Sequence, residues 1–377
     1  MLQFESWKKL LVLFVIALGV IYASPNLLPK GEDGSIPLLP GKQVNLGLDL
    51  QGGSHLLMLV DMDVVEKERL VGFGETIRQE FRQEKIRFSD LKVAKKSVQV
   101  TLRKDEDAVK AKEIFGALDS GLLVTNEGTV YTLGFSEEGL IEIRTQTVEQ
   151  SIEIIRRRID PDGTKEPVIQ RQGADRVLVQ LPGVDDPETV KRLLGRTAKL
   201  TFQLVDTSIT PQEAISRGRV PPGSVLLPSD KNDGISYVIE KRVMVSGEML
   251  DSATASFDQN NRPSVSFTLN ASGAKRFGRV TGTNIGRPFA IILDGQVVSA
   301  PTIQGQIFGS GQITGAFTVA ETNELALILR AGALPAPLIV LEERSIGPGL
   351  GADSVVAGEI AALVGLLLVI IYMLLSY

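Results

Sequence analysis

The stretch from Ser136 to Gly183 decides the fold of this chain, and it reads SEEGLIEIRTQTVEQSIEIIRRRIDPDGTKEPVIQRQGADRVLVQLPG. Its first half predicts an amphipathic helix over Glu137–Ile159, because apolar residues such as Val148 and Ile155 recur at helical spacing. Ser136 is a suitable N-cap, and the two acids after it favour the helix N-terminus. DPDG then ends the helix, and two apolar runs on either side of GAD predict a β-hairpin.

The elements after this hairpin suggest the fold class. Asp186 is expected to cap a second helix that starts at Pro187, and AKLTFQLVD (198–206) alternates as a strand does. With one preceding strand, this order is typical of the split βαβ pattern of ferredoxin-like folds. We therefore expect an α+β protein with a ferredoxin-like base.

A separate strand with one buried face is predicted in NLGLDLQGGSHLLMLVD (45–61). Gly52 and Gly53 interrupt it, and glycine permits backbone conformations and close approaches that side chains forbid. We interpret the pair as a bulge or tight contact, with Asp49 on the polar side. The alternative is a simple turn between two short strands.

Further elements follow from local patterns. Helices are expected over 64–86 and 105–118, strands over 92–103 and 121–135, and loops over 207–236. A second module follows from about 240. It has an alternating strand at 265–269, a helix capped by Ser272, a hairpin at Asp294-Gly295, a second hairpin in 306–314, and a helix from the Thr318/Glu321 capping box to Gly332.

Composition excludes several kinds of chemistry. The 377 residues include no cysteine and one histidine, and the net charge is −5. Disulfides, cysteine ligands and thiol catalysis are therefore impossible, and an acidic chain is not typical of nucleic-acid binders. We expect His55 to be structural, the acids at 61–68 to be the solvated start of a helix, and the Arg156–Arg158 cations to complement a helix dipole. We predict no enzyme, metal or cofactor.

Two uncharged apolar segments predict membrane helices. The first, within 8–28, follows Lys8 and Lys9, so its N-terminus should stay in the cytoplasm; an uncleaved anchor is favoured over a removed signal peptide. The second is expected over 355–377, cut short at the chain end. Most of the chain would then lie outside the cytoplasm.

Several motifs carry a resemblance to a known family. LGLDLQGG (46–53), the block 147–184, AIILDGQVVSAPTIQG (290–305) and EERSIGPGLGADSV (342–355) occur in the order found in the N-terminal portion of the SecD family. These proteins, with SecF, are accessory subunits of the bacterial protein-export translocase and are similar in build to resistance–nodulation–division pumps.

The resemblance implies an organisation and partners. It implies a periplasmic base over 40–206, a head over 240–335 that receives unfolded secretory polypeptide, a return segment over 336–354, and two flanking transmembrane helices in the bacterial inner membrane. The implied partners are SecF, the SecYEG translocon, YajC and membrane lipid. The family's proton-linked acid lies in a later membrane helix, and Glu359 does not match it, so energy coupling is not assigned to these residues.

The resemblance also singles out residues as motif or structural positions, none of them catalytic: Asp49, Gly52, Gly53, Arg158, Asp160, Pro182, Gly183, Asp294, Gly295, Gly347, Pro348 and Gly351. Two alternatives to an export accessory stay open. One is a small-molecule or lipid transporter component of similar architecture, and the other is a membrane-anchored periplasmic enzyme.

Overall fold

The computed structural model describes residues 6–23, 52–161, 163, 167–183, 187–230, 234–346 and 348–376. Two units are distinguished. One comprises the chain before Gly53 and after Ile346, and it contains helices α1 (Ser6–Ala23) and α10 (Pro348–Ser376). The other is Gly53–Ile346, and it contains all the sheets described below.

Within the described residues, one helix is long and apolar enough to cross a membrane. It is the Asp353–Ser376 part of α10, 24 residues with a mean hydropathy of 2.5. A helix of this length rises about 36 Å at 1.5 Å per residue, which exceeds a hydrocarbon core of about 30 Å. The helix itself begins earlier, at Pro348.

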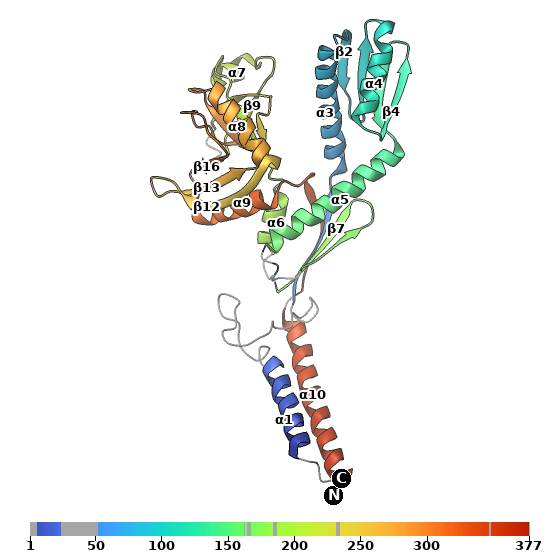
Figure 1. Cartoon of the computed structure of the whole chain (residues 1–377), viewed down its shortest axis with the longest axis vertical. Coiled ribbons are helices and arrows are strands. Elements are labelled where there is room, and N and C mark those ends of the chain that lie inside the picture. Colours follow the sequence, from blue (N-terminus) through green and yellow to red (C-terminus); the bar gives the residue numbers. More distant parts are fainter. Residues whose placement is uncertain are drawn as a thin grey trace. The chain divides into compact units, whose positions relative to one another are not determined.

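The first lobe is a four-stranded antiparallel sheet with two helices on one face. The sheet order is β17-β1-β7-β6, and α5 and α6 share a core with it. Figure 1 shows α5 beside β7, with α6 next to α5. Its elements are β1 (Gly53–Val60), α5 (Glu137–Ile159), β6 (Val168–Gln172), β7 (Arg176–Pro182), α6 (Pro187–Gly195) and β17 (Leu338–Ile346).

An inserted lobe separates β1 from α5 in the sequence. Its sheet has the order β2-β3-β5-β4, and its own core is built around Phe81, Phe115 and Tyr131. The long helix α3 also contributes Met62 and Val65 to the first lobe's core, so it joins the two. The elements are α3 (Met62–Gln83), β2 (Phe88–Val93), β3 (Ser97–Leu102), η2 (Asp105–Asp107), α4 (Ala108–Leu118), β4 (Leu122–Glu127) and β5 (Val130–Phe135).

The second lobe occupies the sequence between α6 and β17. Four aromatic rings, Phe202, Phe267, Phe277 and Phe289, meet at its centre with centroids 5.4–6.2 Å apart. They join the sheet β11-β8-β14-β15 to the sheet β12-β13-β16 and to α8.

The second lobe's elements lie together in Figure 1. Its helices are α7 (Pro211–Arg217), η3 (Gly247–Met249), α8 (Ala271–Thr283) and α9 (Val319–Ala331). Its strands are β8 (Leu200–Leu204), β9 (Ser224–Pro228), β10 (Ser236–Glu240), β11 (Val245–Ser246), β12 (Leu250–Phe257), β13 (Pro263–Leu269), β14 (Phe289–Leu293), β15 (Gln296–Ser299) and β16 (Ser310–Thr314).

Local signals predicted many elements correctly. Helix α5 has its predicted bounds, and the Ser136 side chain accepts a hydrogen bond from the Gly139 N–H. Both hydrogen bonds of the Thr318/Glu321 capping box are present at α9. Asp294 and Gly295 have φ values of 50° and 81°, the positive pair that a two-residue hairpin turn requires.

The predicted identity of the strand that closes the first lobe is wrong, because pairing over long sequence distances overrides local order. The strand in 198–206 does not close the first lobe, since β8 pairs with β14 in the second lobe. The closing strand is β17, which lies in the supposed return segment and pairs with β1.

Three further predictions need correction in the second lobe. Residues 207–236 are not all loop, because α7 and β9 lie there, and α7 begins with a complete capping box. Asn270, not Ser272, caps α8, since its side chain accepts from the Gly273 N–H. Residues 306–314 form no hairpin, because β16 pairs with β13.

The acids at 61–68 are also not all solvated. Glu66 is buried and lies 3.6 Å from Arg144, so it forms an ion pair between α3 and α5.

Candidate functional site: the joint between the first and second lobes

Arg158 forms the centre of the joint between the two lobes. It was predicted to be a solvated cation in the last turn of α5, but its side chain is only 1% exposed. Its Nη1 donates to the carbonyl oxygens of Leu193, at 3.0 Å, and Arg196. Its Nη2 donates to those of Thr197 and Gly332, each at 3.0 Å.

These acceptors belong to the two chain segments that connect the lobes. Leu193, Arg196 and Thr197 lie at the end of α6 and in the segment that leads to β8. Gly332 follows α9 in the segment that leads to β17. The last carbonyls of a helix lack intrahelical partners, so a guanidinium placed among them satisfies groups that would otherwise be unpaired. Burial lowers the pKa of Arg158 to about 10, while the charge of Asp294 acts to raise it.

Asp294 holds the first connecting segment from the side of the second lobe. Its carboxylate accepts hydrogen bonds from the Thr197 hydroxyl, from the Ala198 N–H at 3.1 Å and from the Lys199 N–H at 2.9 Å. The two connecting segments also bond to each other, because the Leu334 N–H donates to the Thr197 oxygen at 2.8 Å.

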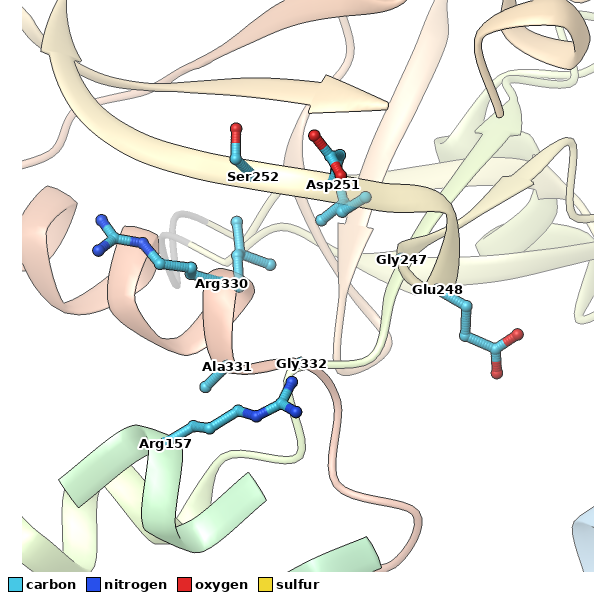
Figure 2. Close-up of a pocket in the computed structure, with 10 residues that line it drawn as sticks. Arg157, Gly247, Glu248, Asp251, Ser252, Arg330, Ala331 and Gly332 are labelled. Atoms are coloured by element: carbon cyan, nitrogen blue, oxygen red, sulfur yellow. The ribbon is translucent and has the colours of Figure 1, made fainter. Parts of the chain in front are cut away.

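A cleft of about 230 Å³ lies beside this joint. Figure 2 shows Arg157 entering from α5, while Glu248 and Asp251 come from the second lobe. Gly332 also lines the cleft, next to the C-terminal end of α9. Arg157 forms an ion pair with Glu153 of its own helix, at 3.0 Å. The second-lobe side of the cleft carries both signs of charge, because Arg330 lines it together with Glu248 and Asp251.

Predicted glycine and proline positions cluster at the other end of the first lobe. Gly53 opens β1 and is paired with Pro182 on one side and Ile346 on the other. Gly52, Gly53 and Gly183 have φ values of 73°, 140° and 68°. Both residues of the double glycine thus have the positive φ that glycine permits. The predicted bulge is not found there within β1, because the register shift of this strand lies at Leu57/Met58.

The remaining predicted positions are distributed as follows. Asp160 is the C-cap residue of α5. Pro348 and Gly351 lie in the first turns of α10. Asp49 and Gly347, like the capping Asp186, lie outside the described residues. The structure thus brings Arg158 and Asp294 together, a proximity that no local signal indicated.

Comparison with known proteins assigns this architecture to a class. Family models match at three places: "SecD/SecF GG Motif" at 38–64, "Protein translocase subunit SecDF, P1 domain, N-terminal" at 148–207 and "SecDF, P1 head subdomain" at 224–336. The last match covers most of the second lobe, and the first includes the double glycine.

Whole-chain relatives agree. The chain is 44% identical over 380 residues to the protein translocase subunit SecD of Rickettsia felis, covering 100% of this chain and 72% of the relative. It is 37% identical over 417 residues to that of Rhodobacter capsulatus, covering 100% and 74%. A SecDF crystal structure in a super-membrane-facing form matches with a TM-score of 0.51 and 27% identity, covering 95% of this chain and 38% of that chain.

The class is therefore that of protein translocase subunits. The chain belongs to the SecD family.

Proposed function

We propose that this chain is the polypeptide-handling part of a Sec translocase accessory subunit. The first lobe acts as a base, and the second lobe is a head that receives secretory polypeptide as it emerges. The observation that carries this proposal is the match of 224–336 to the SecDF P1 head subdomain, on a lobe that two connecting segments join to the base.

The surface of the second lobe supports this role. Phe308 is 70% exposed, and Phe257 and Ile285 are also exposed on the same lobe. Exposed large apolar side chains are available to contact the apolar segments of an unfolded chain. The proposal assigns no catalytic step to this chain.

We further propose how the chain is placed. The sheet order β17-β1-β7-β6 with α5 and α6 supports a ferredoxin-like base. Helix α10 would be one membrane span and α1 a second, with a cytoplasmic N-terminus and both lobes in the periplasm. Association with SecF and the SecYEG channel, in translocation that the proton gradient drives, belongs to the same proposal, but the proton path itself is not assigned to these residues. The transporter alternative is not favoured by the comparisons.

Site-specific photo-crosslinking in the assembled translocase tests the proposed function. A photoreactive residue at Phe308 or Phe257 should crosslink to a stalled secretory polypeptide. Leu123 of the inserted lobe, 58% exposed, is a control of similar exposure and apolar character. Crosslinks from the second lobe but not from Leu123 would support the head assignment, and crosslinks from neither Phe308 nor Phe257 would refute it.

A further inference from the structure

The segment 196–199, which leads from α6 into β8, is held from two sides by opposite charges. Its Arg196 and Thr197 carbonyls accept hydrogen bonds from the Arg158 guanidinium. Its Ala198 and Lys199 N–H groups donate to the Asp294 carboxylate. Arg158 binds the carbonyl groups of the segment and Asp294 binds its N–H groups, so the two charges make different contacts with the same segment.

Each charge is itself held rigidly. Arg158 is buried on α5, and its planar guanidinium has a fixed fork of donors, which suits several carbonyls at once. Asp294 lies in the two-residue turn between β14 and β15, where its φ of 50° and the 81° of Gly295 fix the hairpin. Ala198 between them has a φ of 61°, a left-handed conformation that is uncommon for a residue with a side chain.

The second connecting segment is tied to the same point. Gly332, with a φ of 96°, gives its carbonyl to Arg158, and Leu334 donates to Thr197. Arg158 therefore contacts both segments through which the second lobe is attached to the first. A change at this one side chain would affect both attachments together.

We propose that Arg158 and Asp294 are positioning residues that set the orientation of the second lobe on the first by holding the two sides of segment 196–199. This inference rests on the proposed function, in which the second lobe works as a head on a base. The cleft lined by Arg157 and Glu248 lies beside the joint.

The absence of cysteine makes a distance measurement straightforward. Ile141 on α5 and Val319 on α9 are exposed, and each can be replaced by cysteine and spin-labelled in the full chain in lipid nanodiscs. Pulsed electron resonance then gives the distance distribution between the lobes. We expect a single population in the parent and a second, shifted population in Arg158→Lys and in Asp294→Asn.

Two matched controls separate positioning from general damage. Arg156→Lys changes an exposed arginine two residues away on the same helix. Asp258→Asn changes a turn carboxylate that also accepts two backbone N–H groups, but in the β12–β13 turn away from the joint. Both should keep the parent distribution.

The outcomes distinguish the possibilities. Parent-like distributions in both Arg158→Lys and Asp294→Asn, or equal shifts in the controls, would overturn the proposal. If Arg158→Lys does not fold, Asp294→Asn decides alone, since asparagine retains the turn geometry. Failure of the Phe308 and Phe257 crosslinks would refute the proposed function, whereas unshifted distances with intact crosslinks would refute only the positioning role.

Discussion

Replacing Arg158 by methionine should destabilise the protein more than almost any other single change in the first lobe. Methionine fills much of the same volume, so the main loss is of hydrogen bonds to four carbonyl oxygens. Thr197 retains the Leu334 N–H as a donor. The described bonds give no second donor to Leu193, Arg196 or Gly332.

The magnitude follows from these three acceptors. A buried carbonyl left without a donor costs about 1–3 kcal/mol. The summed cost of the three unpaired carbonyls is reduced because the substitution also removes a charge that is unfavourable to bury. That desolvation lowers the pKa of Arg158 to about 10. Replacing both partners of a buried ion pair by apolar groups can leave the stability unchanged. Here only the donor can be replaced, because its acceptors are backbone carbonyls. We therefore expect a net loss of about 3–5 kcal/mol, as when one partner of a buried pair is removed.

Urea unfolding of the full chain, followed by circular dichroism, measures this loss. Arg157→Met is the matched control, because Arg157 is the neighbouring residue, its side chain is 60% exposed and that of its ion-pair partner Glu153 is 55% exposed. Such pairs contribute about 0–1 kcal/mol. A loss below about 1 kcal/mol for Arg158→Met, or equal losses for the two variants, would show that the carbonyls find other partners and would refute the reasoning.

Three further outcomes are expected. Gly139→Ala should cost about 1–3 kcal/mol in urea unfolding, because its Cβ would lie 2.5 Å from the Gly121 carbonyl oxygen, which is backbone and cannot turn aside. Gly53→Val should cost at least about 1 kcal/mol in the same assay, because φ is 140° there. Hydrogen bonds from the Thr318 backbone and hydroxyl lower the pKa of Glu321 below 4.5, so its contribution is present above that pH and is lost as pH falls through the folded-state pKa; the stability difference between the parent and Glu321→Gln should shrink on acidification.

What the sequence predicted correctly depends on neighbours in the chain. The bounds of α5, the hairpin after it and the Asp294-Gly295 turn each follow from residues within a few positions of one another. The capping box of α7, Thr210 with Glu213, has the same kind of signal and could have been found, since Pro211 follows the cap.

The errors share a different cause. An alternating apolar pattern says that a strand has one buried face, but it does not name the partner strand. β8 follows α6 directly, yet it pairs with β14, about ninety residues later. Arg158 was misread for the same reason, because a cation in the last turn of a helix normally complements the dipole in solvent. Here two segments that are distant in the sequence, containing Leu193 and Gly332, cover the Arg158 side chain.

The topology explains why the joint falls where it does. The first lobe is assembled from three separate segments of the chain, and β17 pairs with β1 only after the entire second lobe has intervened in the sequence. The chain must therefore leave the first lobe after α6 and re-enter it before β17, so both connecting segments pass through the joint between the lobes. A single buried side chain with several donors at that joint can bind both connecting segments. A lobe attached at one end of the chain would have only one such segment. Arg158, at the end of α5, occupies that position and donates to both connecting segments. The insertion of the second lobe between α6 and β17 therefore explains both why local sequence patterns gave the wrong closing strand and why one side chain contacts both attachments of that lobe.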